Sequence, residues 1–244
     1  ISSLVLADLE GVPPVETTGQ VRWFKRPTPG HTYLTSLDPS MGTGGDYAAI
    51  QVFELPTFEQ VGEWHHNMTP MNQQVRILQG INKHIHDSII EKDSSASPQI
   101  FYSMENNTIG EAALMRVMDI GEENIMGMFL SEPIRKGHRR KFRRGFNTTA
   151  KHKIDACTKF KELVEGGKMK INSQLLISEM KDFVATGLSY KAKPGQHDDL
   201  VSSCLLMTRM MKVLADFDPK IFEKWTDRSS EMTTPMPIFG NFYG

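Results

Sequence analysis

The sequence predicts an α/β domain with a mixed central sheet and helices on both faces of that sheet. Three stretches of β-type composition follow one another before any long helical pattern appears, at residues 32–37, 47–55 and 58–64. Helical and β-type patterns then alternate as far as residue 215. Three consecutive strands followed by such alternation are typical of a mixed sheet that helices cover on both sides.

Local composition places the remaining elements. Residues 1–31 contain Pro13, Pro14, Pro27 and Pro29 and are expected to be an irregular lead-in with one edge strand near 21–24. Two further strands, both short and apolar, are predicted at 98–104 and 125–130. Helices, recognised by their apolar spacing or their cap residues, are predicted at 70–91, 109–118 (with Thr108 as cap), 150–164, 172–183 and 198–215. We therefore expect one domain over 32–216, followed by a tail at 217–244.

Composition excludes several classes of protein. Of the 244 residues, 39% are hydrophobic and 23% are charged, which is typical of a globular chain. No apolar run approaches the roughly 20 residues of a membrane-spanning helix. Cys157 and Cys204 are too few for a disulfide framework or a cysteine-based zinc site, so we expect a reducing compartment. The chain starts at Ile1 without a signal peptide, and we expect it to be part of a longer protein.

A strongly basic segment interrupts a chain whose net charge is only −1. Residues 135–153 hold five Arg and four Lys with no Asp or Glu, and Phe142 and Phe146 lie among them. Such a segment suits a polyanion, because each cation placed at a phosphate releases counterions and guanidinium groups match phosphate oxygens. The alternative is a solvated loop without a ligand.

Carboxylates stand at three element ends that this topology would bring together. Asp38 ends the first main strand, Glu105 ends the fourth, and Asp198-Asp199 opens the last helix. If the first and fourth strands pair in parallel, their carboxyl ends lie side by side, where ligands bind in such sheets. Clustered carboxylates repel one another unless an oxygen-preferring cation neutralises them, and Mg²⁺ or Mn²⁺ is the expected choice. Taken singly, Asp38 could instead cap a turn and Asp198 or Asp199 could be an N-cap.

The histidines gave a weaker signal. His65-His66 and the pair His84 and His86 suggest a transition metal, but no third ligand follows at a usual zinc spacing. His197 precedes the acidic pair and could orient Asp199 or contact a phosphate, although an exposed histidine before a helix is the simpler interpretation. We therefore did not expect zinc.

Three segments resemble the nuclease motifs of large terminases, the DNA-packaging motor proteins of tailed bacteriophages, and T-even-like phages in particular. They are residues 35–47 (TSLDPSMGTGGDY), 102–110 (YSMENNTIG) and 196–201 (QHDDLV), and they occur in the family's order. The resemblance implies a ribonuclease H-like (resolvase/integrase-type) fold and a metal-dependent endonuclease that cuts concatemeric viral double-stranded DNA. It also implies Mg²⁺ as cofactor, with two ions during catalysis.

The same resemblance assigns roles to residues. Asp38, Glu105 and Asp199 would be the catalytic carboxylates, Asp198 a further metal ligand and Asp46 a secondary acid. The expected DNA-binding residues, all basic, are Arg139, Arg140, Lys141, Arg143, Arg144 and Lys151.

The family's full-length proteins also carry an ATPase domain. This chain has no GxxxxGK[ST] pattern, and we expect the glycines at 42–45 to allow a close backbone approach to the metal site or DNA. The expected partners are therefore DNA and, through the full-length protein, the phage portal and small terminase subunit, without a membrane. We expect the protein in the host cytoplasm and transiently at the portal vertex, but not in the mature virion.

Two rival functions remain open from the sequence. The same fold could act as a DNA clamp or motor-docking module that does not cut, or as another ribonuclease H-like nuclease such as a junction resolvase. A resolvase would require four-way junctions, whereas a clamp would bind DNA with a steep salt dependence and no need for magnesium.

Overall fold

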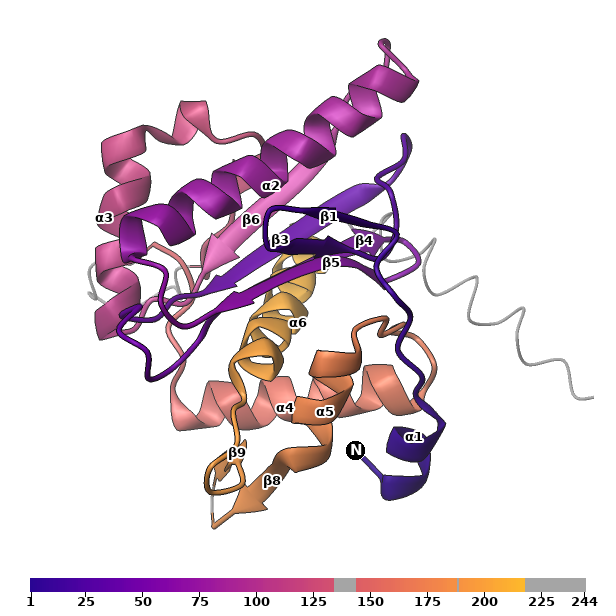
Figure 1. Cartoon of the computed structure of the whole chain (residues 1–244), viewed down its shortest axis with the longest axis vertical. Coiled ribbons are helices and arrows are strands. Elements are labelled where there is room, and N and C mark those ends of the chain that lie inside the picture. The colour runs from indigo at the N-terminus through magenta and orange to yellow at the C-terminus, as the bar shows by residue number, and fades with distance from the viewer. Residues whose placement is uncertain (134–143, 188, 218–244) are drawn as a thin grey trace, which may run out of the picture.

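A seven-stranded mixed sheet forms the centre of the molecule (Figure 1), in a computed structural model that describes residues 1–133, 144–187 and 189–217. Its strands, in spatial order, are β1 (Glu16–Thr18), β2 (Val21–Trp23), β5 (Glu59–His66), β4 (Ala48–Leu55), β3 (Thr32–Asp38), β6 (Gln99–Met104) and β7 (Met128–Phe129). The pairs from β1 to β3 are antiparallel, and β3–β6 and β6–β7 are parallel. The mixed sheet expected from the sequence is confirmed.

Helices cover both faces of this sheet (Figure 1). On one face lie α2 (Met71–Lys92) and α3 (Thr108–Ile120), and on the other lie α4 (Ala150–Glu165), α5 (Gln174–Asp182) and α6 (Asp199–Phe217). β4 is buried along its whole length, because both of its faces are covered. α6 packs on the two central strands β3 and β4. These contacts fix the position of α6 against the sheet.

The segment before Thr32 is more regular than the expected lead-in. It begins with a short helix, α1 (Ser3–Asp8), and continues into β1 and β2. The predicted edge strand near 21–24 corresponds to β2, which lies inside the sheet between β1 and β5. Trp23 of β2 is only 1% exposed, because its ring packs against Gly62 of β5 in the space that a larger side chain would fill. This contact explains why β2 lies inside the sheet.

Two local expectations were wrong, and one pair of strands was not predicted. The strand expected at 125–130 is reduced to the two residues of β7, with the 3₁₀ turn η1 (Glu122–Asn124) just before that stretch. The cap of α3 is Asn107, whose side chain accepts a hydrogen bond from the Gly110 amide, so Thr108 is already inside the helix. After α5 the chain forms an unpredicted antiparallel hairpin, β8 (Phe183–Thr186) with β9 (Ser189–Ala192).

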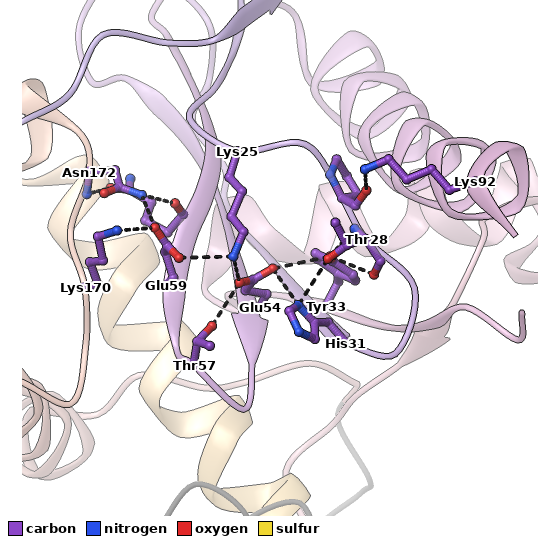
Figure 2. A network of polar contacts seen from close by, with 12 residues as sticks. Lys25, Thr28, His31, Tyr33, Glu54, Thr57, Glu59, Lys92, Lys170 and Asn172 are labelled. Carbon is purple, nitrogen blue, oxygen red and sulfur yellow. Dashed lines mark hydrogen bonds and ion pairs between the residues drawn. The ribbon is translucent and has the colours of Figure 1, made fainter. Parts of the chain in front are cut away.

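A polar network fastens the segment before α5 to the sheet (Figure 2). Lys25 pairs with the buried Glu54 and lies 3.2 Å from Glu59. Glu59 also accepts hydrogen bonds from Lys170 at 2.6 Å and from the Asn172 side chain at 3.1 Å. Because α5 begins at Gln174, these contacts help to set where α5 stands against β5.

Of the tail expected at 217–244, only Phe217, the last residue of α6, lies within the described residues. No helix in the described part of the chain is long and apolar enough to cross a bilayer.

Candidate metal centre

Asp38 and Glu105 lie side by side at the carboxyl edge of the sheet. β3 and β6 pair in parallel from Thr32 with Gln99 to Leu37 with Met104, so the residues that follow each pair stay in register. The Glu105 amide donates a hydrogen bond of 3.2 Å to the Leu37 carbonyl, which extends the ladder by one step. The parallel pairing on which the predicted cluster depended is therefore confirmed.

The position of Glu105 is held from its other side as well. The segment after the undescribed stretch forms an isolated parallel bridge in which Phe146 pairs with Glu105. Around it, the Asn106 amide donates to the Phe146 carbonyl at 2.8 Å. Gly110 of α3 passes so close that an added Cβ would stand 1.8 Å from the Glu105 carbonyl oxygen. The backbone at Glu105 is thus enclosed by a strand, a bridge and a helix.

Electrostatics at this pair favours a bound cation. Burial, then the Glu105 carboxylate and then Asp199 raise the pKa of Asp38 well above its usual range. Desolvation and like charges both oppose ionisation, and a divalent cation relieves both when it binds carboxylate oxygens. Asp38 and Glu105 therefore fit an Mg²⁺ or Mn²⁺ ion.

Asp199 approaches from α6 and has two further neighbours. The ligand atoms of Asp199, His65 of β5 and Glu179 of α5 all lie within 4.8 Å of one another. Among the described residues, these three side chains form a group whose spacing could hold a metal ion. Burial and then Asp198 raise the pKa of Asp199 to about 6. Asp199 thus acts electrostatically on Asp38, while its carboxylate lies near His65 and Glu179 and 3.6 Å from His197 Nδ1.

Glu179 holds the start of α6. One of its oxygens accepts hydrogen bonds from the backbone amides of Leu200 at 2.9 Å and Val201 at 3.1 Å. The first amides of a helix lack partners within the helix, and a carboxylate there is favoured by the helix dipole. Burial nevertheless raises the pKa of Glu179 to about 8, with Asp199 and Asp198 adding to the shift.

The two secondary acids lie on different sides of Asp199. The Asp198 carboxylate accepts a hydrogen bond from the Ala192 amide of β9 at 3.2 Å and lies 3.9 Å from the Lys153 ammonium. Asp46 is exposed in the glycine-rich connection, and its charge contributes to the raised pKa of Asp199. Asp198 is thus engaged by β9 and α4, while Asp46 acts on Asp199 from solvent.

The glycine-rich connection approaches a neighbouring turn. Gly42 has a φ of +68°, and a Cβ there would stand 2.1 Å from the Thr69 carbonyl oxygen. The Gly44 amide donates to the Asn67 carbonyl at 2.9 Å. The close backbone approach expected of these glycines is real, but at Gly42 the partner is the turn that leads into α2.

Only part of the predicted DNA-binding set can be placed. Arg139, Arg140, Lys141 and Arg143 lie outside the described residues. Arg144 pairs with Glu122 and stands 5.2 Å over the Phe129 ring. Lys151 is exposed in the first turn of α4.

A cavity of about 120 Å³ opens between the acidic pair and helices α4 and α6. Its lining includes Asp38 and Glu105 together with the basic side chains of His152, Lys153 and Arg209, of which Arg209 also pairs with Glu132. Carboxylates able to hold a cation, in one cavity with basic side chains, suit a phosphate group with its counterion.

Sequence reasoning missed His65 and Glu179. The pair His65-His66 was noticed, but its partners stand 114 and 134 residues further along, far beyond a local ligand spacing. Glu179 carried no signal, because a glutamate within a predicted helix is ordinarily a solvated surface residue. The positions of Asp38, Glu105, Asp198 and Asp199 show that these carboxylates are near one another and influence each other's charge. Their roles as metal ligands stay predictions.

The sheet order and the acidic edge define a ribonuclease H-like domain, and comparison with solved structures supports this class. The large terminase nuclease of the thermophilic phage G20c superposes with a TM-score of 0.60 at 18% identity, covering 83% of this chain and 94% of that one. The nuclease domain of the Thermus phage P74-26 large terminase gives 0.59 at 18% identity, with coverages of 83% and 90%. The human cytomegalovirus terminase nuclease domain, soaked with Mn and bound to an inhibitor, gives 0.54 at 13%, with coverages of 86% and 93%. The G20c nuclease has also been solved with bound magnesium, cobalt and zinc.

The sequence model of the terminase RNaseH-like domain matches residues 35–210, well over half of the chain. This protein therefore belongs to the terminase RNaseH-like domain family.

Proposed function

We propose that this domain is the metal-dependent DNA endonuclease of a phage packaging terminase, cutting concatemeric viral double-stranded DNA with little sequence preference. The observation that carries the proposal is the juxtaposition of Asp38 and Glu105 at the carboxyl edge of β3 and β6, with Asp199 acting on Asp38. Family membership and the metal-containing structures of similar nucleases support it.

Each side chain has a distinct task in this proposal. Asp38 and Glu105 hold the cations, and Asp199 completes the site from α6. Two Mg²⁺ ions, or Mn²⁺ in their place, would activate a water molecule and neutralise the leaving oxygen of the phosphodiester. Lys153 and Arg209, which line the same cavity, would hold the phosphate oxygens in place.

DNA would be gripped through its backbone. Phosphate contacts carry no sequence information, which suits an enzyme that cuts when a head is full rather than at a defined site. The exposed Lys151 belongs to this grip, together with the predicted basic residues from Arg139 to Arg143. If so, Lys151→Ala lowers DNA affinity and reduces the slope of log K against log salt by about 1.

The remaining parts of the proposal concern the parent protein. We infer a T-even-like phage source and a neighbouring ATPase domain, through which the portal and the small terminase subunit are contacted. The protein would act in the host cytoplasm, transiently at the portal vertex, and would be absent from the mature virion.

Cleavage of supercoiled plasmid tests the central claim. The chain is incubated with Mg²⁺, Mn²⁺ or EDTA beside Asp38→Asn and Asp199→Asn, with Asp87→Asn as matched control, an exposed acid of α2 paired with Lys83. We expect metal-dependent linearisation and degradation, at least about 100-fold slower in both site variants and unchanged in the control.

Cleavage of a four-way junction beside linear duplex, together with a DNA-binding measurement with and without metal, separates the rival functions. Cleavage confined to four-way junctions would overturn the terminase assignment in favour of a resolvase. DNA binding that is indifferent to metal, with no cleavage in Mg²⁺ or Mn²⁺, would overturn the nuclease in favour of a clamp.

A further inference from the structure

His65 presents a buried nitrogen that the protein leaves without a hydrogen-bond partner. Its Nε2 atom is shielded from solvent and makes no hydrogen bond with the described residues. That atom faces Glu179 Oε1 at 3.7 Å. Asp199 lies beside this pair, since one ligand atom from each of the three side chains lies within 4.8 Å of the other two. Buried polar atoms are nearly always paired, so an orphaned one calls for an explanation.

The separation of 3.7 Å is too long for a hydrogen bond and suits two ligands of one ion. An N–H···O hydrogen bond spans about 2.7–3.2 Å. Nitrogen and oxygen ligands about 2.1 Å from a tetrahedral ion stand about 3.4 Å apart. A small movement of either side chain would bring the two atoms onto a shared cation.

Both side chains are held in place by contacts that leave these two atoms free. The Tyr47 ring stacks on His65 with centroids 4.1 Å apart and an interplanar angle of 17°. The second carboxylate oxygen of Glu179 is occupied by the amides of Leu200 and Val201. His65 Nε2 and Glu179 Oε1 therefore face each other without a hydrogen bond between them. Metal ligands that neighbouring contacts hold in position before the ion binds have this arrangement.

We propose that His65 and Glu179, together with Asp199, bind a divalent transition-metal ion beside the Asp38–Glu105 pair, with Asp199 shared between the two positions. An imidazole nitrogen with two carboxylates favours Zn²⁺, Co²⁺ or Mn²⁺, whereas Mg²⁺ prefers oxygen ligands and retained water. The ion would join β5, α5 and the first residue of α6. No third ligand for these histidines stands nearby in the sequence, whereas the fold places Glu179 of α5 and Asp199 of α6 beside His65.

The proposal goes beyond the nuclease activity and does not depend on it. Binding is measured directly, by calorimetric titration with Zn²⁺ and by the visible spectrum of bound Co²⁺. The starting protein is the Asp38→Asn, Glu105→Gln double variant, which removes the oxygen pair so that the remaining tight binding reports the new site. Loss of plasmid cleavage in this background bears on the proposed function alone.

His65→Phe is then added, because phenylalanine keeps the ring that stacks on Tyr47 and removes the nitrogen. The matched control is His66→Phe, the next residue of β5, whose Nδ1 instead contacts the Thr69 hydroxyl at 2.7 Å. We expect one ion per chain in the starting protein, at least about tenfold weaker binding with His65→Phe, and a change below about twofold with His66→Phe. The Co²⁺ spectrum should change only with His65→Phe.

A second variant keeps the test decisive if His65→Phe does not fold. Glu179→Gln retains an oxygen for the Leu200 and Val201 amides and removes the charge that an ion requires, so it should also weaken Zn²⁺ binding at least about tenfold. Equal Zn²⁺ affinity in the starting protein and in the folded variants, or absence of binding at millimolar Zn²⁺, would overturn the proposal.

Discussion

Ser36 and Ser203 join β3 to α6 reciprocally. The Ser36 hydroxyl donates to the Ser203 carbonyl at 2.9 Å, and the Ser203 hydroxyl donates to the Ser36 carbonyl at 3.1 Å. Ser36 stands two residues before Asp38, and Ser203 stands about one helical turn after Asp199. Both serines are fully buried, so this double contact fixes the distance between the two elements that carry the carboxylates.

Replacing Ser203 by Ala should therefore lower both stability and cleavage. The substitution removes the buried hydrogen bond from Ser203 to the Ser36 carbonyl, which costs about 0.5–1.5 kcal/mol in the free energy of unfolding. Urea unfolding measures this loss, and Ser178→Ala, exposed on α5, is the control that should change it by less than about 0.5 kcal/mol. A Ser203→Ala protein as stable as the parent would show that the contact does not hold α6.

Gly110 offers a test of the position of Glu105. An alanine Cβ would stand 1.8 Å from the Glu105 carbonyl oxygen, so Gly110→Ala must displace the backbone that carries this carboxylate. We expect weaker Mg²⁺ binding by calorimetry and a loss of about 1–3 kcal/mol in unfolding free energy. Gly80→Ala in α2 meets nothing within 4 Å and should stabilise the chain by about 0.5–1 kcal/mol. Unchanged Mg²⁺ affinity in Gly110→Ala would contradict the prediction.

Stability of the metal-free protein should fall as the pH rises. The pKa of Glu179 is raised from 4.5 to about 8 and that of Asp199 from 3.8 to about 6, mainly by burial. A carboxyl whose pKa is raised by folding contributes stability below its unfolded pKa, and this contribution is lost as the pH rises through the folded value. Between about pH 4 and 8 the unfolding free energy in EDTA should therefore decrease, by an amount on the order of a few kcal/mol.

Glu179→Gln isolates this effect. Because glutamine does not titrate, the decrease between pH 6 and 8 should be much smaller in the variant than in the parent, as measured by thermal unfolding in EDTA. Parallel pH profiles for the two proteins would show that Glu179 ionises with an ordinary pKa.

The network of Figure 2 should make Glu54 one of the more sensitive polar positions. Glu54 is fully buried and pairs with Lys25, and it also contacts His31 at 2.9 Å and the Tyr33 hydroxyl at 3.3 Å. Removing one partner of a buried pair leaves the others unsatisfied, so Glu54→Ala should cost about 3–5 kcal/mol in urea unfolding. Glu16→Ala breaks an exposed contact with Arg26 at 3.6 Å and should cost at most about 1 kcal/mol. Similar losses in both variants would contradict this ranking.

Several parts of the fold were predictable because their signals are local. The strands at 32–37, 47–55, 58–64 and 98–104 were found from their composition, and helices α2, α4 and α6 from their apolar spacing. The proximity of Asp38 and Glu105 also followed, because parallel pairing of two strands in the expected order places their ends together. The length of β7 could not be predicted, because it depends on which residues pair with the edge of β6. Of the residues at 125–130, Met128 and Phe129 do so.

The order of the elements and the residues at their ends can be read from the amino-acid sequence, and so can the acidic edge of the sheet. Which side chains lie beside Asp199 depends on how distant elements pack. His65 and Glu179 belong to a strand and a helix whose meeting depends on how α5 packs against α6 and how α6 packs on β3 and β4, and no local pattern records that packing. The spacing of apolar residues specifies which face of a helix or strand is buried. Which residues contact that face depends on how the elements pack in the folded core.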